Sequence, residues 1–262
     1  MRCHTTASPF EGCVHERRAG RARFAPSVNA VFAALLAICG LDTVNVAAQE
    51  QSVKPGINAN FDAPVVQEWV ERFEKEGREV YDKREQLVEL CQIKPGQTVA
   101  DVGAGTGLFT RLFAKAVGDN GKVMAVDISD EFIDNILQRA KEAKQSNIEG
   151  VICAPDDAKL SPNSVDVVYI CDTYHHFEFP LKTMASIFKA LKPNGRVVLV
   201  DFKREAGQSS DWVMGHVRAG QKTVREEVES VGFKQLSEQN DLLKENYIMV
   251  FGKSPVSGSS VN

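Results

Sequence analysis

Short apolar runs alternate with amphipathic segments through the middle of the chain. The apolar runs cover residues 98–102, 122–127, 150–154, 165–171 and 196–202, and helical spacing appears near 107–117, 131–144 and 181–191. Runs such as "VDVVYIC" and "RVVLV" are apolar on both faces, which is typical of strands covered by helices on both sides. The pattern predicts a doubly wound α/β domain.

The end of the chain departs from this alternation. A helical segment, "TVREEVESVGF", ends at Gly232, and the strand-like runs "KQLSEQ" and "NYIMVFG" follow with only "NDLLKE" between them. So short a connection permits an antiparallel pair of strands but no parallel crossover. We therefore expect a Rossmann-like, seven-stranded sheet that is mostly parallel, with an antiparallel last strand.

Other segments flank this domain, which we assign to residues 94–252. Residues 63–93 begin with "APVVQEWVERF", whose apolar side chains recur at helical spacing, and they are expected to form N-terminal helices. Residues 49–62 are mostly polar, contain a proline and a glycine, and are interpreted as a linker. Residues 253–262 are expected to be a flexible tail.

The first 48 residues resemble an export signal. Four arginines crowd positions 17–23, and the nearly uncharged run "SVNAVFAALLAICGL" follows them. We predict a signal peptide over 1–48 that is cleaved near Ala48, and hence an exported or periplasmic protein. If the segment is not cleaved, the protein is cytoplasmic or tethered to a membrane. No stable membrane span is expected, because the run is shorter than the roughly 20 residues that a spanning helix needs.

Composition and cysteine usage narrow the class of partner. The formal net charge of -4 provides no basic footprint, so a nucleic acid is not expected as a partner. Beyond the predicted signal, Cys91, Cys153 and Cys171 each lie within an apolar stretch. An odd number of such residues indicates core thiols rather than disulfides or a zinc site. Nothing in the sequence indicates an oligomeric state.

A glycine-rich stretch follows the first predicted strand. Asp101, Gly103, Gly105 and Gly107 form D-x-G-x-G-x-G between a strand and a helix. Glycines allow a sharp turn that presents backbone amides to a ligand at the start of a helix. The spacing departs from the dinucleotide fingerprint G-x-G-x-x-G, because Leu108 stands where the third glycine would be.

Aspartates follow three further strands of the predicted sheet. Asp127 ends the second strand, Asp157 follows the third, and Asp172 follows the fourth. The carboxyl ends of parallel strands meet at one crevice, where open α/β sheets bind their ligands. A carboxylate at the end of the second strand can accept hydrogen bonds from both hydroxyls of a ribose.

With these motifs, the sequence resembles the class I S-adenosylmethionine-dependent methyltransferases over residues 94–252. The segments "ADVGAGTG", "VDIS", "DDAKLSPNSVDVV" and "ALKPNGRVVLVDF" stand in the order and spacing of that family. The resemblance implies S-adenosyl-L-methionine as cofactor and a small-molecule methyl acceptor, as in methyltransferases of the ubiquinone/menaquinone type. It implies a cofactor-binding set of Asp101, Gly103, Gly105, Gly107, Asp127, Ile128, Asp157, Ala158 and Asp172.

The resemblance also implies which part of the cofactor each of these residues would contact. The glycines would lie against its methionine part, with Asp101 near the charged groups. Asp127 would bind the ribose and Ile128 the face of the adenine. Asp157 and Ala158 would bind the adenine edge.

Two other functions remain open at this point. A nicotinamide-dependent oxidoreductase is favoured by the glycine loop and Asp127, but the glycine spacing and the final strand pair disfavour it. An exported protein that binds the cofactor without turnover would keep the same motifs.

The stretch "CDTYHHFEFP" carries the catalytic candidates. Tyr174, His175 and His176 follow the fourth predicted strand, and a histidine titrates near neutrality and can take a proton from an acceptor. A metal held by His175, His176, Glu178 and Asp172 is possible by residue type. Adjacent side chains of one loop rarely converge on one ion, so the sequence predicts no metal.

The flanks of the domain add possible rim residues. Asp201, His216 and Arg218 could bind an acidic substrate or be ordinary surface groups. An aromatic stripe on the N-terminal helices, Trp69, Phe73 and Tyr81, could be a lid, although such a stripe is more often simple packing.

Overall fold

The computed structural model of the protein describes residues 49–253. The predicted signal peptide and nearly all of the predicted tail lie outside the described residues, so the export of this protein stays a prediction. Within residues 49–253, none of the helices combines the length and apolar character that crossing a membrane requires.

A single sheet of seven strands forms the centre of the described chain, in the order β3-β2-β1-β4-β5-β7-β6. The strands β1 to β5 pair in parallel, and β7 runs antiparallel to both of its neighbours, β5 and β6. The strands are β1 (Thr98–Val102), β2 (Lys122–Asp127), β3 (Ile148–Ile152), β4 (Val165–Cys171), β5 (Leu191–Phe202), β6 (Phe233–Gln239) and β7 (Asn246–Lys253).

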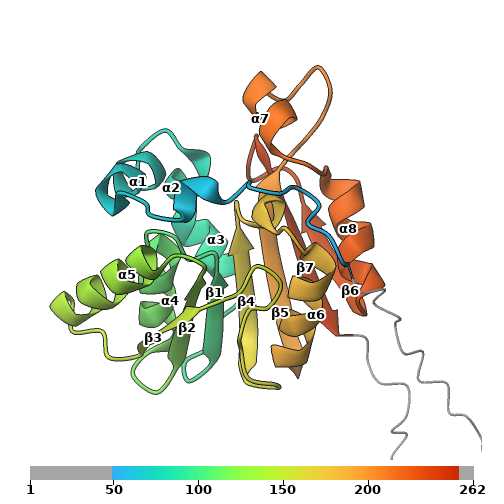
Figure 1. Ribbon diagram of the computed structural model, residues 1–262. Coiled ribbons are helices and arrows are strands. Elements are labelled where there is room, and N and C mark those ends of the chain that lie inside the picture. The colour runs from blue at the N-terminus through green and yellow to red at the C-terminus, as the bar shows by residue number, and fades with distance from the viewer. Residues whose placement is uncertain (1–48, 254–262) are drawn as a thin grey trace, which may run out of the picture. The chain divides into compact units, whose positions relative to one another are not determined.

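Helices cover both faces of this sheet (Figure 1). The α-helices are α1 (Val66–Phe73), α2 (Glu79–Asp82), α3 (Arg84–Leu90), α4 (Leu108–Val117), α5 (Asp130–Glu142), α6 (Pro180–Ala190), α7 (Asp211–His216) and α8 (Gln221–Ser230). The 3-10 helices η1 (Ala59–Phe61) and η2 (Tyr174–His176) are single short turns. The fold is therefore doubly wound, as the sequence predicted.

The alternation of side chains along each strand explains the two layers. In β4, Val168 and Ile170 pack on the face that α6 and α8 cover, whereas Val167 and Tyr169 pack on the face of α3, α4 and α5. Both sets are buried. Successive side chains of a strand point to opposite faces, so a strand between two helical layers must be apolar throughout.

The predicted elements are largely confirmed, with local differences. The strands β1, β2 and β4 have the predicted bounds, while β3 lies at Ile148–Ile152 instead of 150–154. The strand β5 begins at Leu191, before the predicted start at 196, because Leu191 pairs with Val165 of β4 ahead of a register shift. The three described cysteines are free thiols, as expected.

The N-terminal segments are anchored to the domain by ion pairs. Glu74, at the end of α1, lies 2.8 Å from the Arg111 guanidinium of α4 and 3.2 Å from that of Arg139 in α5. The Glu74 and Arg111 side chains are largely shielded from water, which strengthens their attraction relative to exposed pairs, whereas Arg139 is 32% exposed. Figure 1 shows α1 and α7 at the same end of the sheet, beyond the carboxyl ends of the parallel strands.

Residues 49–62, interpreted from the sequence as a linker, make specific contacts with the domain. The backbone N–H of Val53 donates to the Glu178 carbonyl at 2.9 Å, and the Asn58 side chain donates to the His176 carbonyl at 3.1 Å. These bonds position the segment beside the loop that follows β4.

Candidate active site

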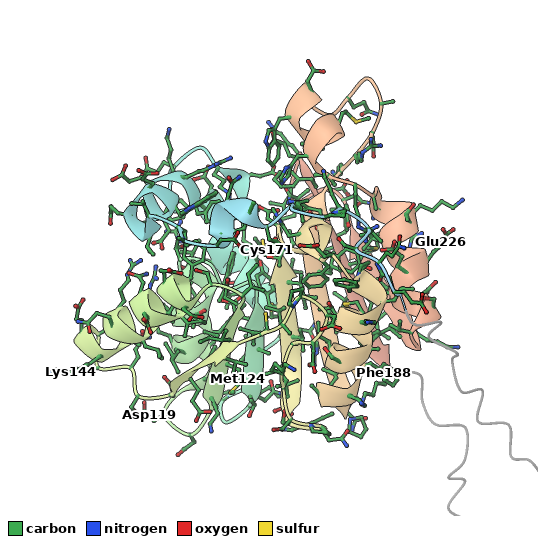
Figure 2. All side chains as sticks on the ribbon, viewed as in Figure 1. Asp119, Met124, Lys144, Cys171, Phe188 and Glu226 are labelled. Carbon is green, nitrogen blue, oxygen red and sulfur yellow. The ribbon has the colours of Figure 1, made fainter. Side chains whose placement is uncertain are left out.

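A cavity of about 520 Å³ opens at the carboxyl ends of β1, β2 and β4. The strand order reverses between β1 and β4, and such a switch point is where open α/β sheets bind ligands. Figure 2 labels Cys171, the last residue of β4, which lies at this edge of the sheet and lines the cavity. The volume of the cavity is that of a small-molecule or cofactor site.

The glycine loop after β1 forms one wall. Gly103 has a φ of 73° and lines the cavity, and a Cβ atom there would lie 2.2 Å from Cγ2 of Thr173. No other residue type fits that contact without displacing the loop after β4. Gly107 caps α4 with a φ of 76°, and its missing Cβ makes room for Ile136 of α5. Gly103 therefore shapes the cavity, whereas Gly107 allows two helices to pack.

Two buried carboxylates lie beside this loop. Asp127 accepts hydrogen bonds from the backbone N–H groups of Gly105, at 2.8 Å, and Ser129, at 3.0 Å. Burial raises the pKa of Asp127, and these amide donors counter the rise. Asp101 accepts from the Thr110 hydroxyl at 2.6 Å, and burial raises the pKa of Asp101 to about 7. Both groups are fixed by hydrogen bonds before any ligand arrives.

Asp172 joins the sheet to the N-terminal helices. This residue follows β4 with a φ of 49°, and its carboxylate accepts from the Arg78 guanidinium and the Asn246 amide. Burial raises the pKa of Asp172, while the charge of Arg78 acts in the opposite direction. Removing Arg78 would leave a buried carboxylate without its cation, which is costly.

Three histidines meet at the part of the cavity formed by η2 and α7. His175 and His176 lie in η2, His216 ends α7, and all three line the cavity. Nδ1 of His175 lies 2.7 Å from Oδ1 of Asp201, and Nε2 of His176 lies 3.3 Å from Nε2 of His216.

The pKa values of the three histidines are shifted in different directions. Burial opposes the charged form of His175, but the charge and hydrogen bond of Asp201 outweigh it and raise the pKa of His175. Burial, together with the charges of His175 and His216, lowers the pKa of His176 to about 3. Burial also lowers the pKa of His216.

The structure brings most of the predicted site residues to this cavity. Those that line it are Asp101, Gly103, Gly105, Asp127, Ile128, Ala158, Asp172, His175 and His176. Gly107, Asp157 and Tyr174 do not line it. The Asp157 carboxylate is half exposed and lies 3.4 Å from the Lys159 ammonium. The Tyr174 hydroxyl donates to Glu227 at 2.9 Å, on the side of the loop where Arg218 also binds Glu227.

Other cavity residues were missed by sequence reasoning. Asn58, Asn60 and Phe61 come from the segment interpreted as a linker. Trp212 comes from the stretch "DWVMGHVRAG", which the sequence indicated as part of the rim, although its helix α7 was not predicted. A single aromatic residue within the polar stretch 49–62 was the available signal. Trp69 and Phe73 of the aromatic stripe line the cavity, and Tyr81 does not.

The hydrogen-bond acceptors of this cavity suit a nucleoside cofactor that carries a cationic group. Asp127 keeps lone pairs free for hydroxyl donors after accepting from two amides, since a carboxylate offers about four acceptor positions. Asp101 and Asp172 provide acidic groups along the same wall, and Ile128 and Ala158 provide apolar surface. The fold and the site together define a class I S-adenosylmethionine-dependent methyltransferase.

Comparison with known proteins agrees with this class. A model of the family described as a methyltransferase domain matches residues 93–248, which is more than half of the chain. The chain belongs to this methyltransferase family.

Individual relatives match the same part of the chain. It is 31% identical over 132 residues to phosphoethanolamine N-methyltransferase 2 of Caenorhabditis elegans, covering 50% of this chain and 30% of that protein. It is 30% identical over 121 residues to a ubiquinone/menaquinone biosynthesis C-methyltransferase of Ectopseudomonas mendocina, covering 45% and 46% of the two proteins. The chain thus spans less than half the length of these curated relatives.

A solved structure supports the fold alone. The crystal structure of a SAM-dependent methyltransferase from Aquifex aeolicus matches with a TM-score of 0.63 at 23% identity. The match covers 70% of this chain and 96% of that one.

Proposed function

We propose that the protein transfers the methyl group of S-adenosylmethionine to a small-molecule acceptor bound in the same cavity. The combination of two features in one sheet carries this proposal. The sheet ends in β5-β7-β6 with β7 reversed, and the same sheet presents Asp127, fixed by the Gly105 and Ser129 amides, at the cavity wall. The first feature disfavours the nicotinamide-dependent alternative, and the second supplies an acceptor for ribose hydroxyls.

The residues of the chain mainly position and shield the reactants. The bound cofactor supplies an electrophilic methyl group on a sulfonium. Asp127 holds the ribose, and the Gly103 wall lets the backbone approach the cofactor closely. Trp69 and Phe73 of α1 line the cavity and keep water from the reacting atoms. Alignment and exclusion of water account for most of the acceleration of such a displacement.

The part of the cavity formed by η1, η2 and α7 indicates the class of acceptor. It combines the aromatic rings of Phe61, Phe202 and Trp212 with the imidazoles of His176 and His216. Such a wall suits a molecule with a flat or apolar portion and a polar group that receives the methyl. The curated relatives include a methyltransferase of ubiquinone/menaquinone biosynthesis, which is consistent with an acceptor of that kind.

Isothermal titration calorimetry tests the cofactor assignment. S-adenosylhomocysteine should bind the wild-type protein, and NADH should not. Asp127→Ala should weaken S-adenosylhomocysteine binding by about 1 to 3 kcal/mol, because the ribose hydroxyls lose a charged acceptor. Asp157→Ala is the matched control and should leave the affinity unchanged, since that carboxylate is half exposed and does not line the cavity.

The opposite pattern would contradict the proposal. Binding of NADH without binding of S-adenosylhomocysteine would favour the oxidoreductase alternative. Loss of affinity in Asp157→Ala with none in Asp127→Ala would move the nucleoside to another part of the cavity.

A further inference from the structure

We propose that His175, His176 and His216 form a binding site for a divalent transition-metal ion of the zinc class. The chain has five histidines, and these three are all of those that lie within residues 49–253. They come from two elements, η2 and α7, that are separated by the whole of α6 and β5. The sequence predicted no metal, because the candidate ligands recognised there were neighbouring side chains of one loop. His216 lies 40 residues from His176 and was not among them.

The distances between the ring nitrogens suit a shared ion. One nitrogen from each histidine lies within 4.8 Å of the others, and the Nε2 atoms of His176 and His216 are 3.3 Å apart. A tetrahedral zinc ion with Zn–N bonds of about 2.0 to 2.1 Å holds two nitrogens about 3.3 to 3.4 Å apart. The His176 and His216 pair therefore already has the required separation, and the third nitrogen, which lies within 4.8 Å of them, must approach by up to about 1.5 Å.

Asp201 orients the ring of His175 in the manner of metal sites. A carboxylate only accepts, so Nδ1 of His175 carries the hydrogen that points to Oδ1 of Asp201, and the lone pair of the neutral ring is on Nε2. Asp201 also accepts from the backbone N–H groups of His175 and Phe202 and is buried. Metal-ligating histidines commonly donate their second ring nitrogen to a carboxylate held in this way.

The hydrogen bonds of the described residues leave ligating capacity on these rings. The six ring nitrogens have the Asp201 contact and the His176–His216 contact, and Nδ1 of His176 is buried without a partner in residues 49–253. Buried polar atoms in folded proteins nearly always have partners, so a cluster of this kind calls for an explanation.

Aromatic neighbours restrict how the rings can turn. The Trp212 ring stacks on His216 with centroids 4.6 Å apart, and Phe61 packs edge-on against His176 at 5.3 Å. Phe202 packs in the same manner against His175 at 5.6 Å. Rings held on their outer sides keep their nitrogens near one another at low entropic cost.

The chemistry of the three imidazole ligands indicates which metal ions could bind. Three imidazoles suit zinc, copper or nickel and do not suit magnesium or calcium, which prefer oxygen. The carboxylate of Asp201 partly offsets the charge of the ion. The Lys54 ammonium, bound to the main-chain carbonyls of Gly215 and His216, and the Arg72 guanidinium are nearby positive charges that repel a cation at this site.

A site with three protein ligands leaves a coordination position, here on the cavity side. This consequence rests on the proposed function: an acceptor hydroxyl or thiol would bind there after releasing its proton to water. Its oxygen or sulfur would then form the bond to the methyl carbon as the carbon–sulfonium bond breaks, leaving neutral S-adenosylhomocysteine.

Cobalt titration of the full chain, after treatment with a chelator, tests the site directly. Co²⁺ should bind with one ion per chain and show the visible absorption bands of a low-coordinate nitrogen site, and Zn²⁺ should displace it. His176→Ala and His216→Ala should each weaken binding at least about 100-fold, and Asp201→Asn about 10- to 100-fold. The double variant His4→Ala/His15→Ala is the matched control and should bind as the wild type does.

Binding of S-adenosylhomocysteine by each variant separates this inference from other causes. A variant that loses cobalt but binds S-adenosylhomocysteine normally is folded, and its loss belongs to the metal site. Metal binding without S-adenosylhomocysteine binding would overturn the proposed function and leave the metal site standing. Cobalt binding that is absent in the wild type, unchanged in His216→Ala, or lost in His4→Ala/His15→Ala would overturn the metal site.

Discussion

The two halves of the cavity are built by different means. The half formed by the glycine loop, Asp101 and Asp127 belongs to the sheet, and its polar groups are fixed by hydrogen bonds within a few residues or between adjacent strands. The half formed by η1, η2 and α7 lies outside the sheet, and its side chains meet through contacts between segments far apart in sequence, such as Asn58 with His176. The first half is therefore determined locally, and the second by packing.

A substitution where the two halves touch should have the largest effect. Gly103→Ala combines a Cβ placed 2.2 Å from Thr173 with a φ of 73°, and we expect it to lower the free energy of unfolding by roughly 2 to 5 kcal/mol. Gly56→Ala is the matched control, because Gly56 has a φ of 76° and nothing within 4 Å of its Cβ position. That variant should lose only about 1 to 2 kcal/mol. Urea unfolding measures both, and equal losses would show that the contact with Thr173 does not matter.

The half that belongs to the sheet should carry a pH dependence of stability. The folded-state pKa of Asp101, about 7, lies above the usual value for aspartate, so the folded protein holds this proton more tightly than the unfolded chain. The stabilisation is present at low pH and is lost as the pH rises through about 7. Between pH 5 and pH 8, this group should lower the free energy of unfolding of the ligand-free protein by about 2 to 3 kcal/mol.

Urea unfolding of Asp101→Asn across that pH range checks the assignment. The variant should lack the Asp101 contribution and so show a flatter profile than the wild type. Asp157→Asn, at a half-exposed position, should keep the wild-type profile. An unchanged profile in Asp101→Asn would assign the pH dependence to other groups.

The smallest change in stability is expected for Tyr174, whose side chain points out of the cavity. Tyr174→Phe removes a hydroxyl bound to Glu227 and should cost about 1 kcal/mol of stability while leaving S-adenosylhomocysteine affinity unchanged. Tyr247→Phe is the control, since the Tyr247 hydroxyl is buried and has no partner among residues 49–253, and it should cost less. Loss of methyl transfer in Tyr174→Phe, at normal affinity and stability, would return this residue to the catalytic set.

The same division explains what could be predicted from the sequence. Asp127 and Gly103 were identifiable because a strand end and a glycine spacing determine their positions within a short stretch of chain. The partnership of His216 with His176 was not identifiable, because it depends on how α7 packs, and α7 has only six residues and weak helical periodicity. Tyr174 was placed in the catalytic set because it adjoins His175 in sequence. Consecutive residues of a short turn point in different directions, and its side chain packs toward Glu227 instead.

The two salt bridges of Glu74 should affect the rate at which ligands leave the cavity. They tie the end of α1 across α4 and α5, and the Phe73 ring lies 3.8 Å from the position of a Cβ on Gly105. A ligand that leaves past α1 would have to separate Glu74 from Arg111, whose side chains are largely shielded from water, so salt should affect this step little. We expect the residence time of a ligand on this side of the cavity to follow the opening of α1.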